Sequence, residues 1–222
     1  MSVVPVAGVP ESVLAAEDAA RLPAAAPPAP WQARLRAVVW WHRAAPGAVQ
    51  HLPEGLRGRH LPLTVGAMVR YLDTPVGPYS EVLASPVVVV RRGLPAASIP
   101  FIAVDSLASV LGGRANWALP KTMARFAWSG PAACTGEGDG WRVAAAARPR
   151  GPRVPVLAPA RDVQLGPDGR RLEVPIGVRA LVRAAQVDVR TLGPTLPQWL
   201  RPGAHPGVVV ERARMRFGAP RE

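Results

Sequence analysis

The sequence holds 27 lysine and arginine residues, and only one of them, Lys121, is a lysine. An arginine side chain is effectively always protonated, whereas a lysine amine can lose its proton in an apolar site and become a nucleophile. In a chain this rich in Ala, Gly, Pro and Arg, arginine supplies positive charge wherever charge alone is needed. The retained lysine follows the mostly apolar segment Asn116-Trp117-Ala118-Leu119-Pro120, which favours an amine that forms a Schiff base over a surface charge.

Two segments supply the groups that would act with this lysine. The first, Gly77-Pro78-Tyr79-Ser80-Glu81-Val82, places a carboxylate two residues after an aromatic ring. The second runs from Gly112-Gly113-Arg114 to Pro120-Lys121 and places the amine shortly after an expected helix. In this order and spacing they resemble the acetoacetate decarboxylase family, in which an aromatic–x–Glu motif precedes a helix ending in Gly-Gly-Arg, a Trp and a Pro-Lys pair. The resemblance extends over residues 31–130.

The resemblance implies a β-rich α+β fold, namely a cone-shaped, largely antiparallel β-barrel with a few short helices, an apolar central pocket and assembly into homo-oligomers. It implies that Lys121 forms an iminium with a small keto acid, and that Glu81 orients a substrate-facing arginine or relays a proton. It assigns substrate contacts to Arg43, Trp117 and Tyr79, and structural roles beside the site to Arg114 and Pro120.

The simplest reaction for such a site is the decarboxylation of acetoacetate or a related β-keto acid. The iminium accepts the electrons released when the carboxylate leaves as carbon dioxide, and the enamine is then protonated and hydrolysed. Pyruvate aldol condensation and dehydration through the same lysine is an open alternative, because the two reactions differ only in what leaves or joins the enamine. A non-catalytic protein that binds a small keto acid is a third reading of the same residues.

Three positions depart from the family pattern. Thr122 stands where the family has a second lysine, so burial alone would have to lower the pKa of Lys121. His42 stands where the family has an arginine that binds the substrate carboxylate or pairs with the glutamate, and Arg43 reaches that role only through a one-residue shift, which flips a side chain across a strand. A further family carboxylate, which would fall near Gly66 or Ala67, is missing. These departures weaken acetoacetate as the substrate.

Short valine-rich runs separated by Pro and Gly are expected to hold these groups. Asp73-Thr74-Pro75-Val76-Gly77-Pro78 marks the turn of a hairpin. One helix is expected to begin at Asp105 and end at Gly112-Gly113, and a second, short helix is expected at 176–184. The expected strands are 33–41, 62–72, 80–92, 98–104, 122–129, 140–147, 154–157, 171–176 and 206–216.

Residues 1–30 differ in texture from the rest of the chain. They are rich in Ala and Pro and carry a net charge of −2, so we expect a mobile arm, or an arm laid on a neighbouring molecule, with one short helix at 11–21. Residues 31–222 are long enough for a single domain with a sizeable core.

The composition argues against several other classes of protein. No apolar run reaches the roughly 18 residues needed to span a membrane, and Glu11, Glu17 and Asp18 stand where an export signal would be apolar, so we expect a cytoplasmic protein without membrane contact. The net charge of +12 is spread over the chain without a block of five or more like charges, which argues against nucleic-acid binding. The histidines and the one cysteine, Cys134, show no metal-ligand spacing and no phosphate-binding glycine motif occurs, so we expect neither a metal nor a cofactor.

Overall fold

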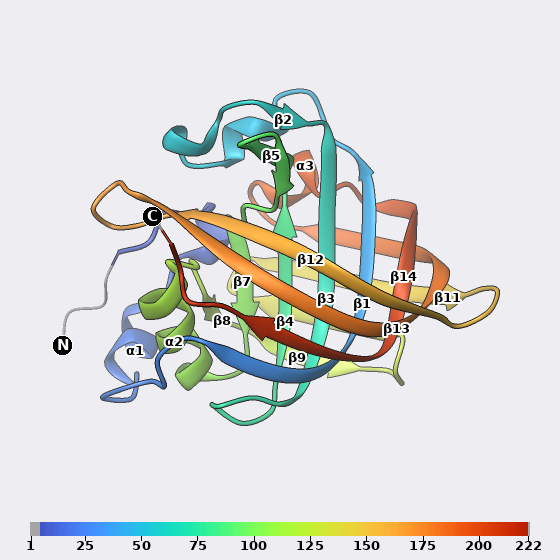
Figure 1. Ribbon diagram of the computed structural model, residues 1–222, viewed down its shortest axis with the longest axis horizontal. Helices are drawn as coiled ribbons and strands as arrows, with labels where there is room; N and C mark the ends of the chain where they lie inside the picture. Colours follow the sequence, from blue (N-terminus) through green and yellow to red (C-terminus); the bar gives the residue numbers. More distant parts are fainter. Residues whose placement is uncertain (1–4, 222) are drawn as a thin grey trace.

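The computed structural model describes residues 5–221 and shows one large sheet that curls into a nearly closed barrel (Figure 1). The strand order is β8-β7-β4-β3-β1-β14-β13-β11-β10-β9, with β12 also paired to β13. Among the described strands of the barrel, only β7 and β8 pair in parallel. The strands are β1 (Trp31–Arg43), β3 (Leu63–Asp73), β4 (Tyr79–Ser85), β7 (Phe101–Val104), β8 (Thr122–Met123), β9 (Arg125–Trp128), β10 (Ala133–Gly138), β11 (Trp141–Pro149), β12 (Val154–Leu165), β13 (Arg171–Leu192) and β14 (Gly203–Phe217).

Smaller elements cover the ends of the barrel. A second sheet, β2-β5-β6, lies at the top of Figure 1, and the helices α1 and α2 lie together at its lower left. No helix in the described part of the chain is long and apolar enough to cross a membrane. These elements are β2 (His60–Leu61), β5 (Val88–Arg91), β6 (Leu94–Ala96), α1 (Ala16–Ala20), α2 (Leu107–Trp117), α3 (Leu196–Trp199), and the 3-10 helices η1 (Pro10–Ser12), η2 (Ala48–His51) and η3 (Glu54–Leu56).

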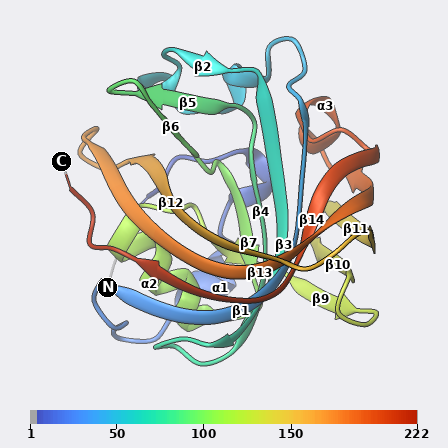
Figure 2. The ribbon, with the colours of Figure 1, turned by 45° about the vertical axis from the view of Figure 1, so that its right-hand side comes forward.

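The long strands β12 and β13 form an arm that crosses over β1 and β3 in both ribbon views (Figures 1 and 2). The outer strand of this arm, β12, forms backbone hydrogen bonds with Ala97, which lies between β6 and β7. The Ala97 amide donates to the Arg161 carbonyl over 2.9 Å, and the Ala97 carbonyl accepts from the Val163 amide over 2.8 Å. These bonds hold the arm against the part of the barrel that carries α2.

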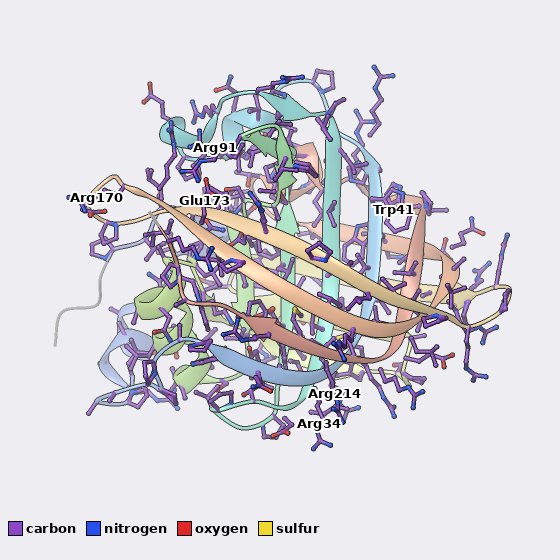
Figure 3. The ribbon with its side chains drawn as sticks, in the orientation of Figure 1. Arg34, Trp41, Arg91, Arg170, Glu173 and Arg214 are labelled. Atoms are coloured by element: carbon purple, nitrogen blue, oxygen red, sulfur yellow. The ribbon has the colours of Figure 1, made fainter. Side chains whose placement is uncertain are left out.

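Beside this arm, β14 and β1 carry apolar residues that face the interior, in alternation with arginines that face outward. On β14, Arg214 stands between Ala213 and Met215, and on β1 Arg34 lies directly opposite Arg214. Figure 3 shows Arg34 and Arg214 side by side, pointing away from the barrel. Because successive side chains of a strand point to opposite faces, this alternation keeps the arginines of β1 and β14 off the inner face.

The β1-β3-β4 part of the sheet is buried on both faces. On one face, Trp40 and Met68 pack with Trp199 in a core whose large side chains are fully buried. On the other face, Ala37 and Ala67 belong to a second apolar cluster. We call these two interiors the filled side and the hollow side.

The segment 176–184, which the sequence analysis assigns to a helix, lies in the middle of β13. It pairs with β12 on one side and with β14 on the other. Its apolar residues Val178, Ala180 and Val182 follow a period of two, with exposed Arg179 between the first two. That period fits a strand with one face toward the interior, and the two flanking strands satisfy its backbone groups.

The start of α2 differs slightly from the expectation. Ser106, not Asp105, caps the helix, and its Oγ accepts a hydrogen bond from the Ser109 amide over 3.2 Å. The Asp105 carboxylate accepts instead from the Ser80 amide over 2.6 Å. The preceding acid therefore ties the helix to β4, the strand that carries Glu81.

The end of α2 was also misplaced, because the helix continues through Gly112 and Gly113 to Trp117 and is terminated by Ala118 in the left-handed conformation. The glycines serve packing instead of termination. A Cβ atom on Gly112 would lie 2.4 Å from the ring of Trp31. The helix therefore approaches β1 at a distance that only glycine permits.

The predicted hairpin is confirmed, since β3 and β4 pair in antiparallel fashion from Val65 opposite Ser85 to Tyr71 opposite Tyr79. The strand expected at 80–92 divides at Pro86 into β4 in the barrel and β5 in the small sheet. Proline has no amide hydrogen for a strand ladder, which explains the break.

The later strands were predicted less well. The strand expected at 122–129 is two strands, β8 and β9, and β10 was not predicted. The strands expected at 154–157 and 171–176 are the first parts of the much longer β12 and β13. Their extension depends on pairing with each other, and a short local pattern does not report that pairing.

Residues 5–30 lie against the barrel, whereas the sequence analysis expects a mobile arm; residues 1–4 lie outside the described part. The buried Glu11 carboxylate accepts hydrogen bonds from the Thr195 amide at 2.6 Å, the Thr195 hydroxyl at 2.8 Å and the Leu196 amide at 2.9 Å. These bonds join the segment to the start of α3. The helix expected at 11–21 is two short pieces, η1 and α1.

Candidate active site

The only lysine of the chain is buried, with 3% of its surface exposed, and its amine lies among three oxygens. Lys121 Nζ donates to Glu81 Oε2 at 2.7 Å, to Ser109 Oγ at 2.9 Å and, more weakly, to the Tyr79 hydroxyl at 3.5 Å. The amine follows α2 and the carboxylate lies on β4, so the fold brings together two groups that are 40 residues apart.

The end of α2 positions the lysine from its backbone and along its side chain. Arg114 Nε donates to the Lys121 carbonyl over 2.8 Å, and the Leu119 amide donates to the Gly113 carbonyl over 3.2 Å. A Cβ atom on Gly113 would lie 2.5 Å from Lys121 Cδ. Gly113 thus leaves the channel through which the lysine side chain reaches Glu81, and Arg114 fixes the point from which it starts.

Glu81 is held on β4 between Val69 of β3 and Val104 of β7. Its Oε1 accepts a hydrogen bond from the Tyr71 hydroxyl at 3.1 Å, while Oε2 pairs with the lysine. The rings of Tyr71 and Tyr79 stack with their centroids 4.4 Å apart. Both carboxylate oxygens are therefore occupied, and the two rings close the cluster on the side of β3.

Burial lowers the pKa of Lys121, but the adjacent Glu81 carboxylate and the Tyr79 hydroxyl raise it by more, so that the pKa lies above its ordinary value. This corrects the expectation that burial acts alone, which took no account of a carboxylate at hydrogen-bond distance. Burial and Glu81 raise the pKa of Tyr71 well above its ordinary value, so this hydroxyl remains a donor. The resting site is an ammonium–carboxylate pair.

A cavity of about 310 Å³ on the hollow side reaches this pair. It lies between the β1-β3-β4 sheet and the inner faces of β12, β13 and β14. Its wall is mainly aliphatic and aromatic and includes Leu35, Val69, Trp117, Leu119, Val182 and Phe217. The amine is the one cationic group that lines it in the described part of the chain.

Sequence comparison assigns the chain to a family. A family model for acetoacetate decarboxylase (ADC) matches residues 18–154, which is more than half of the chain. The chain belongs to the acetoacetate decarboxylase family. No curated protein matches the sequence significantly.

Solved structures of acetoacetate decarboxylases and related enzymes share the fold. The enduracididine biosynthesis enzyme MppR complexed with pyruvate matches with a TM-score of 0.64 and 15% identity, over 88% of this chain and 90% of that chain. A structure of an acetoacetate decarboxylase matches with a TM-score of 0.63 and 14% identity, over 88% and 89%. Acetoacetate decarboxylase from Legionella pneumophila matches with a TM-score of 0.58 and 15% identity, over 100% and 97%. At these identities the likeness shows the fold alone.

The family's carboxylate-binding arginine has no counterpart in the cavity. Arg43 is exposed at the end of β1 and does not line the cavity, and within residues 5–221 no other arginine lines it either. His42 is buried and engaged elsewhere, since its Nε2 accepts from the Arg201 amide at 3.2 Å and its Nδ1 lies 2.9 Å from the Arg43 carbonyl. A substrate carboxylate would therefore meet only the lysine as a cationic partner.

The other predicted residues lie at the cavity or behind it. Tyr79 and Trp117 both line the cavity. Trp117 presents a ring surface, because its Nε1 already donates to the Gly218 carbonyl at 2.9 Å. Pro120 is buried against Gly8, where a Cβ atom would lie 2.8 Å from Pro120 Cβ.

The sequence analysis missed a second carboxyl in the cavity wall, Asp162 of β12. Only 3% of Asp162 is exposed, and the Gln164 amide donates to its two oxygens at 3.0 and 3.1 Å. Burial raises the pKa of Asp162 to about 7. An acid between valine-rich stretches was a usable signal, but the strand expected there ended at residue 157. Within residues 5–221, no three His, Cys, Asp or Glu side chains are grouped as metal ligands.

Proposed function

We propose that this protein is a cofactor-independent Schiff-base lyase that decarboxylates a β-keto acid through Lys121. One observation carries the proposal: the buried side chain of the single lysine lines a mainly apolar cavity, with its Nζ 2.7 Å from the Glu81 carboxylate. A surface role for the lysine is incompatible with this burial, and an inert buried ion pair would not need a cavity in front of it.

Glu81 supplies the base that a protonated lysine requires. Because the pKa of Lys121 is raised, the amine is protonated at neutral pH and must lose a proton before it attacks a carbonyl. The hydrogen bond from Nζ to Glu81 Oε2 gives that proton a direct path. The free amine then attacks the keto carbon, and Glu81 returns the proton to the hydroxyl that leaves as water. The product is an iminium that keeps Glu81 as its counter-ion.

The iminium then accepts the electron pair of the breaking bond. The bond between the α-carbon and the carboxyl carbon breaks, carbon dioxide leaves, and the pair moves through the carbon framework to the nitrogen to give an enamine. The enamine carbon takes a proton, and water hydrolyses the new iminium to the ketone and the free amine. Overall, the β-keto acid anion and one proton become a ketone and carbon dioxide.

A second reaction, aldol condensation of pyruvate followed by dehydration, uses the same lysine and also passes through an enamine, which forms there when the pyruvate iminium loses a methyl proton. The size of the cavity favours keeping it as a candidate, because about 310 Å³ exceeds the needs of one small keto acid and admits a second reactant. The two reactions differ in the fate of the enamine, which either takes a proton or attacks an aldehyde.

Borohydride trapping tests the proposal directly. Reduction in the presence of acetoacetate or, separately, pyruvate converts the iminium to a stable amine, which intact mass and peptide mapping locate. We expect an adduct on Lys121, and no adduct at that position in Lys121→Arg. The keto acid that labels better points to decarboxylation or to aldol chemistry. A folded protein that gives no adduct with any keto acid would contradict the proposal and favour a binding protein without the reaction.

A further inference from the structure

The polar and apolar groups of the cavity are separated. Its polar side chains near the amine form one hydrogen-bonded cluster, in which Glu81 links Tyr71 to Lys121. The indole nitrogens of Trp31 and Trp117, which also line the cavity, donate to backbone carbonyls at 3.0 and 2.9 Å and offer no further donor to a ligand. Apart from Asp162 of β12, the wall therefore offers a substrate polar contacts at its reacting end and apolar contacts elsewhere.

The part of the wall formed by β13 and β14 is apolar and composed partly of small residues. Ala180 of β13 and Ala213 of β14 are paired on neighbouring strands, and both line the cavity. β13 is separated from β4, which carries Glu81, by three strands in the sheet order. The alanines therefore leave space on the side of the cavity that faces the lysine-bearing wall.

This space exceeds what the reacting end of a β-keto acid fills. About 310 Å³ holds about ten atoms of carbon size, if each takes about 30 Å³ as a water molecule does in the liquid. Once bound as an iminium, the keto carbon, the α-carbon and the carboxylate use about half of these places. Room remains for about five more carbons, and acetoacetate, with a single methyl group there, leaves most of it empty.

The charges of the wall decide what kind of group fills that room. No arginine of the described chain lines the cavity, so a second carboxylate in the substrate would be buried without a cation. Asp162 adds to this discrimination, because its buried carboxyl would face any anionic group placed near β12. An uncharged, apolar chain avoids both penalties.

We infer that the substrate is a β-keto acid whose keto carbon carries an unbranched apolar chain of about four to six carbons, and that the wall containing Ala180 and Ala213 binds this chain. The inference rests on the proposed Schiff-base decarboxylation and specifies its substrate. Each methylene group that enters the cavity increases kcat/KM about fourfold, which is the factor that corresponds to the burial of one methylene.

The test is a series of decarboxylation rates with acetoacetate, 3-oxohexanoate and 3-oxooctanoate, each corrected for the rate with Lys121→Arg protein. We expect kcat/KM to rise by about tenfold or more at each step of two methylenes. The matched diacid 3-oxoadipate has the chain length of 3-oxohexanoate but ends in a carboxylate, and we expect it to react at least about a hundredfold more slowly.

A variant that fills the wall locates the chain. We expect Ala180→Leu to reduce the ratio of kcat/KM for 3-oxooctanoate to kcat/KM for acetoacetate by about tenfold or more, because the larger side chain fills the space for the apolar chain. The control is Ala184→Leu, the same substitution on the same strand at an exposed position that does not line the cavity, and we expect no change in chain-length preference.

The outcomes separate this inference from the function on which it rests. If borohydride traps keto acids on Lys121 but kcat/KM is flat or falls from acetoacetate to 3-oxooctanoate, the Schiff-base function stands and the inference is overturned. Equal rates with 3-oxohexanoate and 3-oxoadipate would overturn it as well. If no keto acid is trapped and none is decarboxylated, the proposed function itself fails.

Discussion

The filled side and the hollow side of the barrel are built on the same strands, but one is closely packed and the other contains a cavity. On the filled side, Trp40 and Met68 are fully buried, and Gly66 lets the Trp40 ring lie so close that a Cβ atom would be 2.4 Å from it. On the hollow side, Ala37 and Ala67 line a cavity. Side chains close together on the same strand thus face either a closely packed core or a space for a ligand.

The comparison shows how the protein provides room for a reaction without losing its core. Val38 of β1, which is buried on the filled side, is flanked by Ala37 and Val39, which line the cavity, because the side chains of a strand alternate. The filled side supplies the packing that fixes β1, β3 and β4. The hollow side can then carry small residues and two buried carboxyls, Glu81 and Asp162, beside one amine.

The largest expected effect is on the hollow side, where Lys121→Arg keeps the positive charge and removes the nucleophile. We expect kcat/KM to fall by at least about 10⁴-fold, because no iminium forms. Turnover of a β-keto acid measures it, with the thermal unfolding temperature and circular dichroism as controls for the fold. Lys121→Met is a second variant that removes the amine without adding a guanidinium. Activity in either variant close to that of the parent would rule out the Schiff base.

A pair of identical truncations tests whether the two sides differ in packing. Leu52 is 1% exposed and belongs to the filled side, and Leu35 is 4% exposed and lines the cavity. We expect Leu52→Ala to lower the free energy of unfolding by about 4 kcal/mol and Leu35→Ala by about 2 kcal/mol, because Leu35 already faces a void on one side. Denaturant titration measures both. Equal losses of unfolding free energy in the two variants would mean that the cavity is closed when no ligand is bound.

The role of Glu81 is tested by Glu81→Gln, which keeps the size of the side chain and removes the base. We expect kcat to fall by about a hundredfold, the usual contribution of a general base. Single-turnover trapping with borohydride separates this effect from binding, and we expect adduct formation on Lys121 to be slowed but not abolished. Tyr71→Phe, which removes only the hydrogen bond to Oε1, is the milder control. An unchanged rate in Glu81→Gln would reduce Glu81 to a structural partner.

The smallest effect is a pH dependence that comes from Asp162. Its pKa is raised to about 7, so the folded protein holds this proton more tightly than the unfolded chain does. The contribution of Asp162 to stability therefore falls as pH rises from about 4 to about 7, and it is fully unfavourable above that range. Asp162→Asn removes this loss, and we expect the variant to be more stable than the parent by about 2 kcal/mol at pH 8 and by little at pH 4.

Parallel urea titrations of the two proteins at several pH values measure this difference. Gln164 donates to both oxygens of Asp162, so the asparagine places an amide against an amide at one of them, and this sets a small constant offset. The prediction concerns the change with pH. A difference between variant and parent that stays constant from pH 4 to pH 8 would contradict a raised pKa at Asp162.

The family and the class of fold were predictable from the sequence, because the Glu81 and Lys121 segments carry a specific motif in a specific order. Both are confirmed by the family match and by the barrel. The direction of the pKa shift of Lys121 was not predictable, since it depends on the 2.7 Å distance to Glu81, which is far away in the chain. Local composition reports burial but not the partner that burial brings.

The long-range contacts explain the remaining errors. Residues 1–30 have the composition of a linker, and nothing near Glu11 in the sequence indicates that Thr195 is its partner. The strand β13 was read as a helix at 176–184 because its flanking strands, β12 and β14, decide its conformation. In both cases, tertiary pairing overrides a weak local preference.

The three hydrogen bonds of the Lys121 ammonium have a consequence for spectroscopy. An ammonium that donates to Glu81, Ser109 and Tyr79 in a buried site exchanges its protons with water slowly. Because the chain has one lysine, protein grown with lysine labelled at the ε-nitrogen gives a single nitrogen resonance. That resonance reports the protonation state of the amine in the resting protein, and its replacement by an iminium signal follows the bound carbonyl compound in solution, without chemical reduction.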